Sequence, residues 1–156
     1  MKLTTVQIEK PFCLFLVGMQ CRSWRSLWRM PFIASRMAAM QKELIADPAT
    51  GFLWGKGFAS ARPLTTLFLS YWQSSEDIER FVKSPRYSHL ASVGEYYKKF
   101  KDHPDIGVWH ETYEVFPEHA EAMYFGMNPL GMSGFMPIIP IAKNTQQFKQ
   151  RLRGTS

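Results

Sequence analysis

The chain has 156 residues, of which 46% are hydrophobic and 21% are charged, and its formal net charge is +6. This is the size and composition of one globular domain that can bury a core without disulfides or metal ions. No stretch approaches the roughly 20 apolar residues that a membrane span requires. The short apolar run after the polar first ten residues is also not typical of a secretory signal peptide.

Cysteine usage favours a reducing compartment. Cys13 and Cys21 are the only cysteines, and on one extended segment they would lie roughly 26 Å apart, outside disulfide range. The sequence has no Cys-x-x-Cys pattern and no Cys/His spacing typical of zinc, so no metal site is predicted. We therefore expect free, buried thiols and a cytoplasmic protein.

The first third of the chain predicts a strand followed by a helix. Residues 12–19 form a short apolar run that is typical of a buried strand. Apolar residues then recur every three or four positions from Trp24 to Leu44, and Pro31 predicts that this helix is kinked or restarted. The helix should end before Pro48, because proline disfavours a helical conformation of the preceding residue.

The middle of the chain predicts a hairpin, a second helical region and a further strand. Residues 52–59 and 65–72 are the two strands of the hairpin. Ser74 or Ser75 can cap the helix that follows, and a Ser-Pro pair should break it. Helical spacing then continues in one apolar stripe, which consists of Leu90, Val93, Tyr97 and Phe100. A fourth strand is predicted over residues 106–115.

This order of strand, helix, strand, strand, helix and strand is the ferredoxin-like split βαβ plan. It is an α+β fold with an antiparallel sheet and both helical regions on one face. The other face of the sheet stays uncovered, although the strands are apolar on both sides. We therefore expect a homodimer in which two sheets pack face to face, forming a dimeric α/β barrel with a pocket between sheet and helices.

The C-terminal quarter of the chain predicts three parts of different character. A last strand is predicted over residues 120–126, which completes a ferredoxin-like domain of residues 1–126. Residues 127–142 hold three prolines and two glycines among large apolar residues, so they should form no regular element and pack over the domain. Residues 143–156 are a basic tail, with a short helix predicted at 146–152.

Basic residues gather in the first helical region, interleaved with Trp24, Trp28 and Phe32. They are Arg22, Arg25, Arg29, Arg36 and Lys42. Three interpretations remain open: a solvated helix face, a site for an anion such as a phosphate or haem propionates, and contact with nucleic acid or an acidic membrane. The last of these is the least favoured, and strand 65–72 lacks the glycines and basic residue of an RNA-recognition motif.

The segment 107–115, Gly-Val-Trp-His-Glu-Thr-Tyr-Glu-Val, places a histidine beside carboxylates and aromatics. Strand alternation puts His110 on one face and Glu111 and Tyr113 on the other. We expect His110 to be at least half buried, as a general base, proton donor or haem ligand, or as a core histidine satisfied by Thr112 or a backbone carbonyl. No second histidine follows at four positions, which excludes the zinc-protease motif.

Five blocks carry a family resemblance: Pro48 to Leu53, Tyr71 to Glu79, His89-Leu90, Gly107 to Tyr113, and Tyr124 to Gly131. On these blocks the chain resembles a monooxygenase-like branch of the dimeric α/β-barrel superfamily, which is related to antibiotic-biosynthesis monooxygenases. The wider superfamily holds cofactor-independent oxygenases, haem-degrading enzymes and haem-dependent aldoxime dehydratases. The extension from Met127 onward departs from the shortest members.

The resemblance implies an enzyme acting on a small hydrophobic molecule in an enclosed pocket, as a homodimer. Its catalytic residues would be His110, Glu111 and Tyr113, and its pocket residues Trp109, Trp72, Tyr124 and Met127. The alternative is a haem-dependent lyase or a non-catalytic haem-binding dimer, with His110 or His89 as the iron ligand. His89 is expected on the flank of the second helical region, where a histidine is more often a surface residue.

Overall fold

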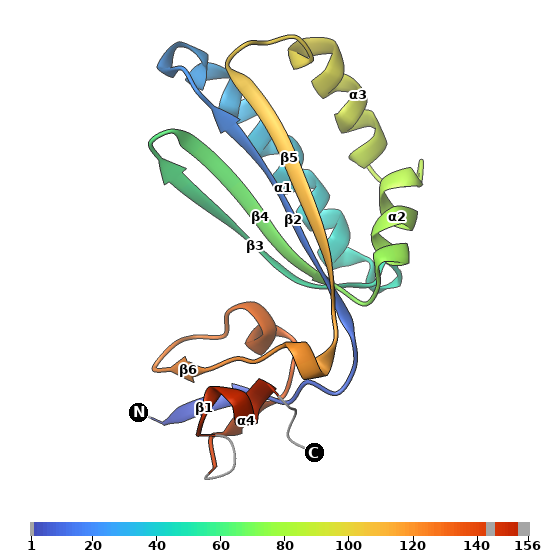
Figure 1. Cartoon of the computed structure of the whole chain (residues 1–156). Helices are drawn as coiled ribbons and strands as arrows, with labels where there is room; N and C mark the ends of the chain where they lie inside the picture. The colour runs from blue at the N-terminus through green and yellow to red at the C-terminus, as the bar shows by residue number, and fades with distance from the viewer. Residues whose placement is uncertain (1, 143–145, 153–156) are drawn as a thin grey trace.

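The computed structural model describes residues 2–142 and 146–152, and it consists of a main sheet covered by helices and a smaller sheet at one end (Figure 1). The main sheet contains β2 (Phe12–Cys21), β3 (Phe52–Ala61), β4 (Leu64–Trp72) and β5 (Ile106–Val115), in the order β3-β4-β2-β5. All three pairs in it are antiparallel. This arrangement confirms the predicted α+β, ferredoxin-like fold.

The register of the sheet decides which side chains face the helices. Cys13, Phe15 and Val17 of β2 pack in or against the core cluster formed with the helices. Because neighbouring strands pair residue for residue, Trp72 and Glu114 lie on the same side as Cys13. The even-numbered residues of β2 therefore point to the opposite, uncovered face of the sheet.

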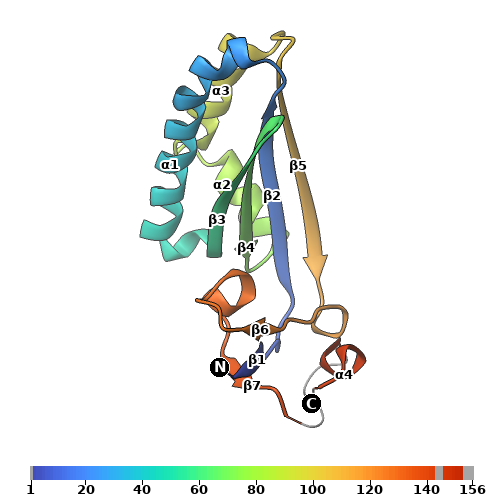
Figure 2. The same ribbon diagram turned by 90° about the vertical axis from the view of Figure 1, so that its left-hand side faces the viewer.

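The helices lie together on one face of the main sheet (Figure 2). They are α1 (Met30–Ala46), α2 (Ser75–Lys83) and α3 (His89–Phe100). A 3-10 helix, η1 (Trp24–Arg29), precedes α1, so the predicted restart at Pro31 is confirmed. Pro31 is the second residue of α1, where a missing backbone N–H breaks no helical hydrogen bond.

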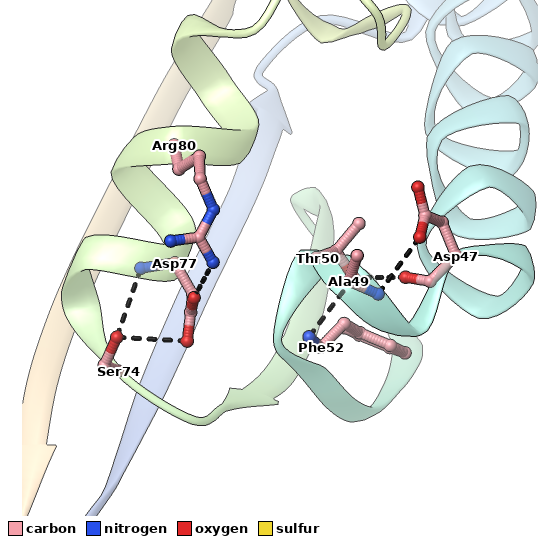
Figure 3. Close-up of polar contacts among 7 residues, drawn as sticks. All are labelled: Asp47, Ala49, Thr50, Phe52, Ser74, Asp77 and Arg80. Atoms are coloured by element: carbon pink, nitrogen blue, oxygen red, sulfur yellow. Dashed lines mark hydrogen bonds and ion pairs between the residues drawn. The ribbon is translucent and has the colours of Figure 1, made fainter.

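Separate groups of polar contacts fix the end of α1 and the start of α2 (Figure 3). The Asp47 carboxylate accepts a hydrogen bond from the Ala49 backbone N–H at 3.0 Å, at the start of the 3-10 helix η2 (Pro48–Thr50). The Ser74 hydroxyl caps α2 by accepting from the Asp77 N–H at 3.2 Å, which confirms the predicted cap. Gly51 follows η2 and lies against the Asp77 carboxyl of α2. Its φ of 76° favours glycine, and a Cβ at this position would lie only 2.4 Å from that carboxyl.

The predicted apolar stripe of α3 is only partly correct. Phe100 is buried, but Leu90, Val93 and Tyr97 are 51%, 38% and 57% exposed. The helix instead turns Ser92, Tyr96 and Phe100 inward. An Arg36–Glu95 ion pair at 2.6 Å fixes its other flank against α1. A face containing one serine and one tyrosine gave no clear apolar signal in the sequence.

The two ends of the described chain form the smaller sheet, in the order β6-β1-β7. Its strands are β1 (Leu3–Val6), β6 (Tyr124–Phe125) and β7 (Ile138–Pro140), and η3 (Pro117–His119), η4 (Gly131–Gly134) and α4 (Phe148–Leu152) accompany them. The predicted strand 120–126 is therefore reduced to two residues, and it pairs with β1. Residues 143–145 and 153–156 of the predicted tail lie outside the described residues.

The uncovered face of the main sheet is apolar. Its half-buried side chains include Leu14, Leu16, Leu67, Leu69 and Trp109. At one end the Phe135 ring packs on Tyr71, with ring centroids 5.1 Å apart, so part of the C-terminal segment covers that end. The helices do not cover the rest of this face, because they lie on the other side of the sheet (Figure 2).

Candidate functional site

The alternation predicted for β5 is confirmed by its pairing with β2. His110 lies opposite Val17, which faces the helices, and Glu111 lies opposite Leu16, which faces away from them. His110 and Glu111 therefore project from opposite faces of the same sheet. Tyr113 shares the face of Glu111.

His110 lies on the helix side of an edge strand, next to Phe15. The centroids of the two rings are 6.0 Å apart and their planes are tilted by 40°. His110 is nevertheless exposed, so the expectation that it is at least half buried is wrong for the single chain. The reason is its position at the edge of the sheet, where Val108 on the same side is also 50% exposed.

Glu111 and Tyr113 form a pair of their own on the uncovered face. The Tyr113 hydroxyl donates a hydrogen bond to the Glu111 carboxylate at 2.6 Å. This bond, together with the negative charge of the carboxylate, raises the pKa of Tyr113. Within one chain the pair cannot reach a molecule bound beside His110, because the sheet lies between them.

His89 is the first residue of α3 and is half buried, unlike the surface histidine expected from the sequence. Its Nδ1 lies 3.2 Å from the Val82 carbonyl oxygen, and its ring is 6.0 Å from that of Phe81. Burial lowers the pKa of the imidazole, and the bond to the carbonyl counteracts this only in part. A histidine whose Nδ1 is held by a carbonyl has Nε2 as its ligating nitrogen.

The four predicted pocket residues lie in three different places. Trp72 is buried on the helix side, where its indole N–H donates to the Ser70 hydroxyl at 3.0 Å. Trp109 lies on the uncovered face against Gly18. Tyr124 belongs to the smaller sheet, where its hydroxyl accepts from the Ser133 N–H at 3.2 Å, and Met127 is 59% exposed. The single chain does not bring them together.

A hollow of about 180 Å³ opens at the start of α2, and sequence reasoning did not find it. Cys13, Ser75, Glu76 and Glu114 belong to its lining, and the Ser75 hydroxyl donates to the Glu114 carboxylate at 2.7 Å. Burial and the two carboxylates raise the pKa of the Cys13 thiol, so it is protonated at neutral pH. Cys13 and Cys21 are both buried and free, as predicted.

Among the described residues His89 could ligate haem, but neither of the two hollows defined there has room for it. No group of three or more His, Cys, Asp or Glu residues among the described residues can hold a metal ion. Histidine lines neither of these two hollows, which measure about 180 and 10 Å³, below the range of about 300 to 1,000 Å³ typical of ligand pockets. Neither hollow of the single chain therefore fits haem.

The arginine cluster divides into two groups. Arg36 joins α1 to α3 through Glu95, so its role is structural. Arg25 and Arg29 stack on Trp24 and Trp28 in η1, with the guanidinium carbon 5.6 and 4.4 Å from the ring centroid.

Among the described residues, no helix is both long and apolar enough to cross a bilayer.

Comparison with known proteins defines the class of this chain. The family model described as monooxygenase af470-like matches residues 12–132, and the chain belongs to this family. A search of curated proteins finds no significant match. The matched region contains the main sheet, its helices and the Trp-His-Glu-Thr-Tyr string of β5, so the resemblance inferred from the sequence is confirmed.

Solved structures share the fold at low sequence identity. The chain is similar to aldoxime dehydratase OxdRE in complex with butyraldoxime, with a TM-score of 0.69 and 14% identity over 96% of this chain and 41% of that one. A second aldoxime dehydratase gives a TM-score of 0.61 and 14% identity over 97% and 42%. The chain thus spans about two fifths of the length of both. SnoaB, a cofactor-independent oxygenase from Streptomyces nogalater, gives 0.47 and 10% identity over 69% and 95%.

Proposed function

We propose that the protein is a homodimeric enzyme of the monooxygenase-like type that oxygenates a small hydrophobic molecule, with His110 transferring the proton. The observation that carries the proposal is the position of His110, open to a ligand yet set in apolar surroundings. Phe15 lies beside its ring. Val108, two residues before His110 on the same face of β5, adds exposed apolar surface.

The chemistry needs no group that the chain lacks. An imidazole suits proton transfer near neutral pH. In the proposed reaction it accepts a proton from a CH₂ group beside a carbonyl, and the resulting carbanion adds to O₂, forming a C–O bond. His110 returns the proton to the peroxide, which loses water with the second C–H proton and leaves a ketone. The substrate supplies all the electrons.

The uncovered apolar face supports the homodimer. Half-buried leucines on β2 and β4 make the centre of this face apolar. The same apolar face on a second copy of the chain is the partner that complements it. The Glu111–Tyr113 pair would then lie at the dimer interface rather than at the site of proton transfer. The free, buried cysteines support action in a reducing compartment such as the cytoplasm.

The test is oxygen uptake with a panel of small aromatic ketones that carry an acidic CH₂ group. His110→Ala should lower the rate at least about 100-fold, as expected for loss of a general base. His119→Ala is the matched control, because His119 is also exposed but lies in η3, beyond the main sheet. Equal rates for wild type and His110→Ala would refute the assignment.

A haem-dependent lyase, or a haem-binding dimer without turnover, is the second candidate, and the orientation of His89 favours it. With Nδ1 engaged by Val82, Nε2 is the nitrogen that would bind iron. Because neither hollow described above is large enough for haem or lined by a histidine, this candidate needs dimerisation to complete the site. A saturable Soret band on adding haemin, lost in His89→Ala and kept in His119→Ala, would support this candidate; no band would exclude it.

A further inference from the structure

The surface of η1 has the reverse of the usual burial pattern. Trp24 and Trp28 are 76% and 72% exposed, and Leu27 between them is 42% exposed. The buried residue of the element is Ser26, which is 2% exposed. Large aromatic side chains normally contribute most of their surface to a core. Here two tryptophans and a leucine point outward from the short 3-10 helix η1.

This turn is firmly attached to the domain through polar contacts. The Ser26 hydroxyl donates to the Asp105 carboxylate at 3.1 Å, and the Arg22 backbone N–H donates to the Asp105 carbonyl at 2.8 Å. The Arg22 guanidinium donates to the Pro104 carbonyl, and the Ser23 hydroxyl caps the turn by accepting from the Arg25 N–H at 3.3 Å. These hydrogen bonds hold η1, and with it the outward-pointing tryptophans, in a fixed position on the domain.

Positive charge surrounds these apolar side chains. The guanidinium groups of Arg25 and Arg29 lie over the rings of Trp24 and Trp28. The Lys99 ammonium lies 3.7 Å from the centroid of the Phe32 ring, at the start of α1. No acidic residue occurs between Glu9 and Glu43 in the sequence. The carboxylate that contacts the turn, that of Asp105, is engaged by Ser26.

We propose that this Trp-Arg patch, consisting of Trp24, Arg25, Leu27, Trp28 and Arg29, docks the protein on the surface of an anionic lipid membrane. Indole rings favour the boundary between headgroups and acyl chains, where one side is apolar and the other is wet. Arginines beside them bind lipid phosphates and respond to the negative surface potential. The patch thus supplies apolar insertion and charge attraction in one turn, without a membrane span.

Two other partners fit the patch less well. Nucleic acid fits less well, because β4 lacks the glycines and basic residue of an RNA-recognition motif and the patch lies in η1 rather than on the sheet face. A second copy of the chain is expected on the uncovered sheet face, whereas η1 leads into α1 on the helix side (Figure 2). The patch therefore stays accessible in the proposed dimer.

The experiment is co-sedimentation of the full chain with phosphatidylcholine vesicles, with and without about 30% phosphatidylserine. We expect partitioning onto the anionic vesicles to be at least about tenfold stronger than onto neutral ones, and to weaken as salt rises. Trp24→Ser with Trp28→Ser, and separately Arg25→Ala with Arg29→Ala, should each weaken it at least about tenfold.

The matched control is Phe148→Ser with Lys149→Ala, which removes an exposed aromatic residue and a neighbouring cation from α4, at the opposite end of the molecule (Figure 1). This variant should partition like wild type. Circular dichroism of every variant establishes that it is folded, and the arginine pair gives the result if the tryptophan pair does not fold. The proposal is overturned if wild type does not bind anionic vesicles, if the control weakens binding equally, or if wild type binds an RNA oligonucleotide and no vesicle.

Discussion

Replacing Leu16 by lysine should separate the proposed dimer without unfolding the subunit. Leu16 lies on the central strand β2 of the uncovered face, opposite Leu69 on β4 and Glu111 on β5. In the single chain a lysine there gains a cross-strand carboxylate, which favours the folded subunit. In a dimer that packs sheet on sheet, the same ammonium group would be buried in the interface.

The size of the effect follows from burial. Fully burying a leucine side chain is worth about 1.5 to 3 kcal/mol, so the half-exposed Leu16 contributes about 1 kcal/mol per subunit at the interface. Burying the lysine costs several kcal/mol more. Both occur twice in a symmetric dimer, so the total exceeds about 4 kcal/mol and weakens dimerisation at least about 1,000-fold.

Sedimentation equilibrium over a series of concentrations measures this directly. Wild type should approach twice the chain mass of 18.1 kDa, and Leu16→Lys should remain at the mass of one chain. Ile45→Lys is the matched control, because Ile45 is 73% exposed on α1, away from the uncovered face, and it should dimerise like wild type. A wild type that stays at 18.1 kDa, or a Leu16→Lys variant that dimerises normally, would refute the reasoning.

Two predictions concern stability. Gly18→Ala should lower the free energy of unfolding by about 1 to 3 kcal/mol, because a Cβ there would lie 2.2 Å from the Thr66 carbonyl oxygen and 2.8 Å from the Trp109 indole nitrogen. Gly57→Ala is the control and should leave the free energy of unfolding nearly unchanged, because a Cβ there meets nothing within 4 Å. Equal urea midpoints for the two variants would contradict this prediction. Burial lowers the pKa of His89 below its ordinary value of 6.5, so its contribution to stability is present above that pH and is lost as the pH falls below it. Urea unfolding at neutral and acidic pH should show a smaller loss for His89→Gln than for wild type, and an equal loss would mean that His89 is not the titrating group.

The sequence predicted the main sheet because its signals were strong and local. The apolar run of β2, the hairpin strands and the Ser74 cap each act within a few residues. The two faces of β5 followed from alternation alone. The smaller sheet was missed, because β1 and β7 are short strands from distant parts of the chain that pair only in the folded protein.

The candidate site was predicted residue by residue, but its layout was not. His110 was identified from its motif, whereas its exposure depends on β5 being an edge strand, which pairing decides. His89 was expected at the surface. Its contacts with Phe81 and Val82 of the preceding helix bury it, and these contacts form only in the folded protein. The pocket residues came from separate sequence blocks, and the fold distributes them over both faces and the smaller sheet.

Proton transfer by His110 is tested most directly by comparing oxygen uptake by His110→Ala and Glu111→Gln, which change two neighbouring residues on opposite faces of β5. Each variant is assayed at a concentration where sedimentation shows the same mass as wild type. We expect His110→Ala to lose at least about 100-fold in rate, while Glu111→Gln keeps a rate close to that of wild type. A large loss in Glu111→Gln with full activity in His110→Ala would contradict the account.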